Sequence, residues 1–177
     1  ENDITRRIRA RIYATIQGLA QPGASILDIN CGTGIDAIAL EHLGYLVSGI
    51  DISEKMINVA RAKAITENCS TVRFSQGSFE RLSSSIHQPV ELVLSNFAGL
   101  NCTNNIPLVA EGLSRIIAPN GFFVGIVMPR FSLWESASYA LRGEWKKALR
   151  RLQRETPATG FGDNTFTVSY HSPSSFI

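Results

Sequence analysis

The sequence lacks the patterns that mark secreted, metal-binding or membrane-spanning proteins. Its 177 residues include only three cysteines, and the absence of Cys-x-x-Cys spacing argues against a disulfide framework and a zinc site. No apolar run approaches the ~20 residues that cross a membrane, and no signal-peptide pattern opens the chain. Neither charge dominates, because 17 basic residues face 15 acidic ones. We therefore expect a cytoplasmic protein without a membrane span or a metal site.

The composition and the order of segments indicate one α/β domain over residues 1–177. A hydrophobic content of 44% with 18% charged residues is typical of a globular protein. Strand-like and helix-like segments alternate from residue 25 onward, which predicts a doubly wound, mostly parallel sheet with helices on both faces. We expect helices at 3–20, 33–43, 54–66 and 106–117, and strands at 25–29, 46–50, 71–75, 90–94 and 121–128.

Acidic residues and a glycine turn occur where two neighbouring strands end. Residues 26–34 read Ile-Leu-Asp-Ile-Asn-Cys-Gly-Thr-Gly, which predicts a buried strand and then a turn. Asp28 lies in that strand, and the next predicted strand is followed by Asp51. Gly32 and Gly34 let backbone approach a ligand because they have no Cβ, and the following helix directs free N–H groups to the same place. This combination predicts a nucleotide-like site.

Two kinds of cofactor fit this turn, and Asp28 distinguishes them. Residues 32–37 satisfy the G-x-G-x-x-A pattern of dinucleotide sites, and Asp51 lies near the position of a ribose-binding acid. A dinucleotide sets a pyrophosphate on the helix N-terminus, where Asp28 would repel it by a few kcal/mol at ~4 Å and an effective dielectric of ~20. S-adenosylmethionine has no phosphate and carries a cationic ammonium and a sulfonium. The acid therefore favours S-adenosylmethionine.

Further motifs follow in an order that resembles the class I S-adenosylmethionine-dependent methyltransferases. The match runs from about Arg6 to Met128, and it implies a Rossmann-like fold and a methyltransferase activity. The matching segments are Leu27-Asp28-Ile29-Asn30-Cys31-Gly32-Thr33-Gly34, Gly49-Ile50-Asp51-Ile52-Ser53 with Met56, Gln76-Gly77-Ser78-Phe79, Leu92-Val93-Leu94-Ser95-Asn96-Phe97, and residues 113–121 before the fifth strand.

The resemblance implies a set of cofactor-binding residues. Those of the first motif and the fourth strand, toward the methionine moiety, are Asp28, Asn30, Cys31, Gly32, Thr33, Gly34, Asn96 and Phe97. Those of the second motif and the adenine loop are Asp51 on the ribose hydroxyls, Ile52 on the adenine face, Met56, Gly77, Ser78 and Phe79. Asn30 and Ser78 depart from the family, which usually has a small residue and often an aspartate there. A neutral Ser78 would bind the adenine amine more weakly.

The pattern changes after Pro129. Residues 131–154 form a basic amphipathic segment, which we interpret as two helices hinged near Gly143. The resemblance implies that the insertion 130–164 is a helical lid over the substrate. We expect a loop at 156–164 and a strand at 165–171, but no candidate for the antiparallel strand pair that ends the family's sheet. A bare fifth strand would be covered by residues 165–171 or by a second copy in a homodimer.

Methyl transfer depends mainly on positioning, so we expect no fixed catalytic constellation. A general base is needed only if the acceptor loses a proton early, and the candidates are His171, Tyr170 and Glu135. The fourth-strand motif lacks the Pro-Pro-aromatic and Pro-Cys steps of enzymes of this fold that act on nucleic acids. We therefore expect a small-molecule methyl acceptor rather than a nucleic acid.

Two other functions stay open at this point. One is an NAD(P)-dependent oxidoreductase, which Asp28 disfavours. The other is a non-catalytic module that keeps the fold and binds an acidic partner. The basic residues of the chain gather in two segments, which form either solvated helix faces or a surface for a phosphorylated substrate, an anionic membrane or a nucleic acid. These residues are Arg6, Arg7, Arg9, Arg11, Arg142, Lys146, Lys147, Arg150, Arg151 and Arg154.

Overall fold

The structure is a computed structural model that describes residues 2–82, 86, 88–97, 99–128, 133–145, 149, 155–159 and 165–170. For residues 135, 136, 155–159 and 165–167 it describes the backbone alone. The chain divides into two compact units. The first comprises Glu1–Asn96 and Pro107–Gly125, and the second comprises Phe97–Ile106 and Ile126–Ile177.

The first unit contains a five-stranded parallel sheet in the order β3-β2-β1-β4-β5. Its strands are β1 (Ser25–Asp28), β2 (Leu46–Asp51), β3 (Arg73–Gln76), β4 (Val90–Ser95) and β5 (Ile117–Gly125). Short apolar runs bounded by turn residues form these strands, as the sequence predicted. The main difference is β5, which begins four residues earlier and ends three residues earlier than expected.

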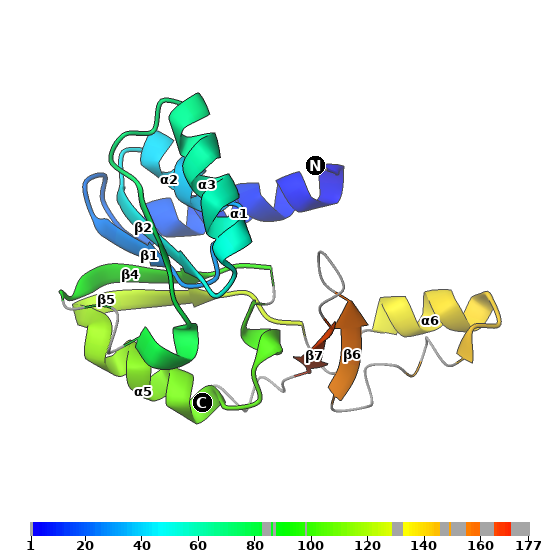
Figure 1. Cartoon of the computed structure of the whole chain (residues 1–177). Coiled ribbons are helices and arrows are strands. Elements are labelled where there is room, and N and C mark those ends of the chain that lie inside the picture. The colour runs from blue at the N-terminus through cyan, green and yellow to red at the C-terminus, as the bar shows by residue number, and fades with distance from the viewer. Residues whose placement is uncertain are drawn as a thin grey trace. The chain divides into compact units, whose positions relative to one another are not determined.

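The helices lie on both faces of this sheet, which confirms the predicted α/β class. Figure 1 shows α1 (Asp3–Leu19), α2 (Ile35–His42) and α3 (Glu54–Thr66) on one face and α5 (Ile106–Ile116) on the other. Asn2 caps α1 by accepting a hydrogen bond from the Thr5 N–H at 2.8 Å, and Ser53 caps α3 by accepting from the Met56 N–H at 3.4 Å. A short 3-10 helix, η1 (Phe79–Arg81), follows β3.

The central strands β1 and β4 form the most deeply buried part of the core. Ile26, Leu27, Leu92, Val93 and Leu94 are all at most 1% exposed. Full burial of such a side chain contributes about 1.5–3 kcal/mol of hydrophobic free energy. The packing therefore fixes the carboxyl ends of β1 and β4, where the predicted site lies.

The early start of β5 has a local cause in its backbone. Ile117 pairs with Val90, but Phe122 pairs with Leu92, so extra residues bulge out between the two pairs. Asn120 takes a left-handed φ of 63° in this bulge. Gly121 has no room for a side chain, because a Cβ there would lie 2.8 Å from the Glu91 carbonyl oxygen. Residues 118–120, which we expected to precede the strand, are thus already part of it.

The second unit contains η2 (Gly99–Cys102), α6 (Leu133–Leu141) and an antiparallel pair of strands, β6 (Glu155–Thr159) and β7 (Thr165–Ser169). Asn101 is fully buried and joins separate segments of the unit. Its side-chain amide donates to the carbonyls of Met128 and Ser169 at 3.0 and 2.6 Å, and its Oδ1 accepts from the Met128 N–H.

The strand pair corrects two expectations. The segment 156–164 is not all loop, because β6 includes Pro157, which is tolerated in a two-stranded ribbon where one strand edge needs no N–H donor. In addition, β7 pairs with β6 and not with β5 in the part of the chain that the structure describes. A homodimer that covers β5 remains a prediction. Of the insertion 130–164, the structure describes one helix, α6, and the strand β6. No helix among the described residues is long and apolar enough to cross a bilayer.

Candidate functional site

The sheet order creates a crevice at the carboxyl end of β1. β1 lies between β2 and β4, and the helices that follow β1 and β4 lie on opposite faces. The chain therefore separates above the ends of these strands, which is where ligands bind in open α/β sheets. Asp28, Asp51 and Asn96 lie at or just after the carboxyl ends of β1, β2 and β4.

Asp51 fixes the turn after β1. One of its carboxylate oxygens accepts the Gly32 N–H at 2.9 Å, and the other accepts the Ser53 N–H at 2.9 Å. The carboxylate thus ties the glycine turn to the start of α3 while its remaining lone pairs stay available to a ligand. These bonds give Asp51 a structural role, and its binding of a ribose stays a prediction.

Gly34 is a glycine for two separate reasons. Its φ of 75° is left-handed, and it precedes the first residue of α2. A Cβ at this position would lie 2.7 Å from the Phe74 ring and 2.9 Å from the Ala60 Cβ. The turn is therefore pressed against the core, and its outer side carries Thr33, whose hydroxyl accepts a hydrogen bond from Lys63 at 3.3 Å.

Asp28 is a buried acid with few partners. It is 1% exposed, and among the described residues its carboxylate accepts one hydrogen bond, from the Asn30 N–H at the long distance of 3.5 Å. Burial is the main cause that raises the pKa of Asp28 well above its usual value, and the nearby Asp36 and Asp51 raise it further. Among the described residues no cation forms an ion pair with Asp28 or Asp51. A bound cation would favour the ionised form of Asp28, which burial disfavours.

Asp36 is a third acid at this crevice, and sequence reasoning missed it. It lies in the first turn of α2 and is 6% exposed. Its carboxylate accepts hydrogen bonds from Arg9 Nε at 2.8 Å, from the Tyr13 hydroxyl at 2.6 Å and from Asn96 Nδ2 at 3.0 Å. Arg9 and Tyr13 are one helical turn apart on α1, which was the available signal. This ion pair has both side chains largely buried, unlike those on the surface of α1.

Asn30 and Asn96 connect the ends of β1 and β4. The Asn30 side chain donates to the Asn96 carbonyl at 2.7 Å and accepts from the Ser95 hydroxyl. This explains the departure at position 30, since a small residue there could not make either bond. The structure therefore brings Asp28, Asn30, Asp36, Asn96 and the glycine turn together into one polar network.

The residues expected near the adenine lie at the ends of β2 and β3. Ile52 is 73% exposed, as a side chain free to cover a ligand face would be. Gly77 donates its N–H to the Asp51 carbonyl at 3.0 Å, and Met56 lies in the first turn of α3. The Ser78 hydroxyl accepts from the Glu80 N–H and so caps η1, whose first residue is Phe79. Contact of these residues with adenine stays a prediction.

The proposed acid–base residues belong to the second unit. Tyr170 is 7% exposed, Glu135 lies on α6, and His171 falls outside the described residues. Phe97 also belongs to this unit and has a left-handed φ of 48°. The role of each of these three residues as a general base stays a prediction.

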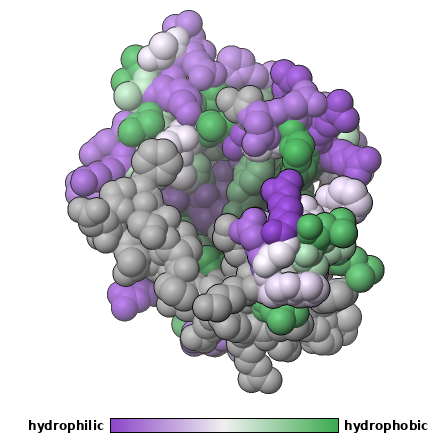
Figure 2. All heavy atoms as spheres, turned by 90° about the vertical axis from the view of Figure 1, so that its right-hand side faces the viewer, coloured by the Kyte–Doolittle hydropathy of each residue, from purple (hydrophilic) through white to green (hydrophobic). Residues whose placement is uncertain are grey.

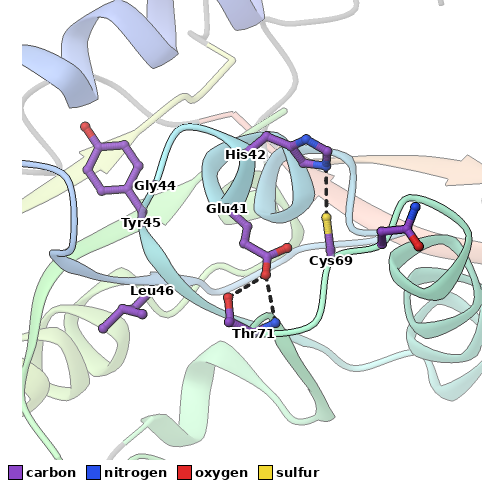
Figure 3. A pocket seen from close by; sticks show the side chains of 8 residues that line it. Glu41, His42, Gly44, Tyr45, Leu46, Cys69 and Thr71 are labelled. Carbon is purple, nitrogen blue, oxygen red and sulfur yellow. Dashed lines mark hydrogen bonds between the residues drawn. The ribbon is translucent and has the colours of Figure 1, made fainter.

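Two of the three cysteines have thiols whose pKa is raised. Burial is the main cause that raises the pKa of the Cys31 thiol, with Asp28 and Asp51 adding to it. Desolvation and the neighbouring Glu41 raise the pKa of Cys69 to about 12. Cys69 lies 3.0 Å from His42 Nε2, at a pocket of about 410 Å³ whose lining residues are shown in Figure 3. Among the described residues no group of three or more potential ligands could hold a metal ion.

Comparisons with known proteins agree with this geometry. A family model described as "Methyltransferase domain" matches residues 26–121, which is more than half of the chain. A ubiquinone biosynthesis O-methyltransferase of Paracidovorax citrulli is 28% identical over 111 residues, which cover 60% of this chain and 45% of that protein. A tRNA (uracil-5-)-methyltransferase homolog A of Mus musculus is 33% identical over 117 residues, which cover 60% of this chain and 19% of that protein.

The fold has a close counterpart among solved structures. The crystal structure of a S-adenosylmethionine-dependent methyltransferase of Methanosarcina mazei superposes with a TM-score of 0.68 and 22% identity, covering 92% of this chain and 79% of that one. The fold and the strand-end acids thus define a methyltransferase domain. The chain belongs to this methyltransferase-domain family. It spans less than half the length of the two curated relatives named above.

Proposed function

We propose that the chain binds S-adenosylmethionine in the crevice at the carboxyl ends of β1, β2 and β4 and transfers its methyl group to a small-molecule acceptor. The observation that carries the proposal is the local charge. Asp28 is buried, no described residue forms an ion pair with Asp28 or Asp51, and both acids adjoin a turn that ends in a close-packed glycine. Such a site selects a ligand that brings positive charge.

The residues present fit this cofactor better than a dinucleotide. A dinucleotide requires its pyrophosphate at the N-terminus of the helix after the glycine turn. In this chain Asp36 lies in the first turn of that helix, in addition to Asp28 just before the turn. Arg9 offsets the charge of Asp36, so an ionised Asp28 is the carboxylate that opposes a diphosphate, by about 4 kcal/mol at ~4 Å and an effective dielectric of ~20. The same charge favours an ammonium and a sulfonium.

The chain's own residues act mainly by binding and orientation. Asp28 and the turn would hold the amino-acid end of the cofactor, and Asp51 would accept hydrogen bonds from its ribose. The Arg9–Asp36 pair is a positioning element, because Asp36 holds the Asn96 side chain. When bound, S-adenosylmethionine supplies a methyl group on a sulfonium that a nucleophile can attack in line. Correct placement of two reactants can lower a barrier by roughly 7–11 kcal/mol.

The proposal of a small-molecule acceptor rests on two supports. The residues after β4 read Ser95-Asn96-Phe97-Ala98, without the proline steps that accompany nucleic-acid substrates in this fold. One of the relatives above is named for ubiquinone biosynthesis. Because the other is named as a tRNA methyltransferase homologue, RNA has to be tested directly.

Binding experiments test the cofactor first. S-adenosylhomocysteine at ~100 times its Kd should stabilise the chain by about 2.7 kcal/mol, or roughly 5–10 °C in Tm for a chain of this size. NAD and NADP at the same concentration should not change Tm. Asp51→Asn should weaken binding of S-adenosylhomocysteine, whereas Glu67→Gln, an exposed acid at the far end of α3, should not. Saturable NAD binding without S-adenosylhomocysteine binding would overturn the proposal.

A labelling experiment then tests the acceptor class. The chain is incubated with cofactor carrying a radiolabelled methyl group and either a panel of small phenols, amines and carboxylic acids or total tRNA. Label should move to extractable small molecules and not to acid-precipitated RNA. Label in RNA alone would reject the small-molecule acceptor while leaving cofactor binding intact.

A further inference from the structure

The helix α6 turns its apolar face to solvent. Leu133, Trp134 and Leu141 lie on one side of the helix, with Ala137 between them, and they are 75%, 85% and 89% exposed. Tyr139, on the opposite side, is half-buried, and so are Ser138 and Ala140 at the borders of the apolar side. An amphipathic helix that packs on its own domain shows the reverse arrangement, with the apolar side inward. The apolar face of α6 is thus available to something outside the described residues.

Two further exposed apolar residues follow α6 in the sequence. Trp145 is 64% exposed and Leu149 is 54% exposed. Together with Leu133, Trp134 and Leu141 these residues form what we term the α6 face. They include both tryptophans of the chain. Single exposed apolar residues need no explanation, but five within seventeen positions mark an interaction site. Figure 2 shows apolar residues in green beside hydrophilic ones in purple at the surface.

Basic residues accompany the α6 face in the sequence. Residues 142–154 contain six arginines and lysines but a single acid, Glu144. Arg142, which directly follows α6, is exposed. An apolar face beside a cluster of cations is complementary to a surface that presents both negative charge and hydrocarbon.

We propose that the α6 face docks on a lipid bilayer that contains anionic lipids, with α6 lying flat in the interface. Tryptophan rings favour the headgroup level, leucines reach the acyl boundary, and lysines and arginines bind anionic headgroups. A polyanion without hydrocarbon, such as RNA, would leave Leu133 and Leu141 in water. Nine helical residues are far too few to span a bilayer, so the interaction is with one surface. This proposal does not rest on the proposed methyltransferase activity.

Vesicle binding tests the proposal on the full chain. We expect the chain to sediment with vesicles of phosphatidylcholine and phosphatidylglycerol, but weakly or not at all with phosphatidylcholine alone. Because both tryptophans lie in the α6 face, intrinsic tryptophan fluorescence reports on this surface alone. It should shift to shorter wavelength on binding, and added salt should weaken the binding because salt screens the charges.

Matched variants separate the α6 face from the rest of the surface. Trp134→Ser and Leu141→Ser should each weaken vesicle binding about tenfold or more, since each removes one buried apolar side chain. Arg142→Gln should weaken it about fivefold. Ile65→Ser, which removes a 79% exposed isoleucine from α3, and Arg11→Gln on α1 are the controls and should bind as the unchanged chain does. Thermal melts confirm that each variant folds.

Three results would overturn the proposal. The first is no binding to either kind of vesicle by a folded chain. The second is equal loss of binding in the α6 variants and in the controls. The third is self-association that Leu141→Ser abolishes without any vesicle binding, which would make this face a contact between copies. Calorimetry with S-adenosylhomocysteine on the same samples reports the cofactor site independently.

Discussion

Asp28→Asn should make the ligand-free chain more stable and its cofactor binding weaker. In the folded chain Asp28 is 1% exposed, and its hydrogen bond from the Asn30 N–H is 3.5 Å long. Burial, followed by the charges of Asp36 and Asp51, raises its pKa. Asparagine has nearly the same shape but no charge to desolvate. An unpaired buried charge of this kind commonly costs a few kcal/mol, so we expect a gain of about 1–3 kcal/mol near neutral pH.

The sign of the pH dependence follows from the raised pKa. The folded state favours the protonated form of Asp28, so its contribution to stability is full below the unfolded pKa and is lost as pH rises through the folded pKa. A bound ammonium favours the ionised form instead. Cofactor binding should therefore release a proton at pH values below the folded pKa, and affinity should rise with pH until Asp28 is ionised.

The size of the binding loss comes from the same charges. An ammonium and a carboxylate ~4 Å apart at an effective dielectric of ~20 attract by about 4 kcal/mol. Part of this is offset by the cost of ionising the buried acid. We expect a net loss near 2 kcal/mol, or roughly 30-fold in Kd for S-adenosylhomocysteine.

Two assays test the expected stability and cofactor affinity of Asp28→Asn. Isothermal titration calorimetry with S-adenosylhomocysteine, from pH ~5 to ~9 in buffers of different ionisation enthalpy, measures Kd and proton release. Urea denaturation without ligand measures stability. The reasoning is refuted if Asp28→Asn lowers the stability of the ligand-free chain, or if it leaves Kd and its pH dependence unchanged.

Arg9→Met leaves the Asp36 carboxylate without its cation in a largely buried position, and we expect urea denaturation to show a loss of about 3–5 kcal/mol. Adding Asp36→Asn to Arg9→Met should recover part of the lost stability. If the double variant instead loses the sum of the two single losses, the Arg9–Asp36 ion pair does not contribute to stability as a pair. Gly34→Ala forces a left-handed alanine against an aromatic ring and should cost more than about 2 kcal/mol in thermal denaturation, whereas Gly18→Ala in the open part of α1 should gain about 0.5–1 kcal/mol. If His171 is the general base, His171→Ala should lower turnover on the identified acceptor and leave the Kd of the cofactor unchanged. Normal turnover in this variant would exclude His171 as the base.

Most of the parallel sheet could be predicted because its signals are local. The apolar run that ends at Asp28, the glycine turn and the Ser53 cap each belong to a few consecutive residues. The hairpin of β6 and β7 could not be predicted in the same way. Pro157 and the glycines between 156 and 164 have the composition of a loop, and only pairing with β7 makes part of the segment a strand.

The candidate site likewise has residues that local motifs predict and residues that they do not. Its glycines and two of its acids lie in motifs that can be read from the sequence. Asp36 resembles an ordinary first-turn acid of a helix, and its partners Arg9 and Tyr13 are 27 and 23 residues away. The one-turn spacing of Arg9 and Tyr13 on α1 is local, but it does not indicate that Asp36 is their partner. Their contact depends on how α1 and α2 pack on the same face of the sheet.

The two main-chain hydrogen bonds to Asp51 limit what this acid can do for a ligand. Because both oxygens are held from the protein side, the carboxylate cannot rotate to follow a displaced or missing hydroxyl group. The carboxylate therefore loses little conformational entropy when it binds a ribose. It also cannot move to recover the hydrogen bond when a ribose hydroxyl is missing, so the loss in binding free energy is not reduced. The affinity lost by deoxyribose analogues of the cofactor should therefore show how rigidly the Asp51 carboxylate is held in the ligand-free chain.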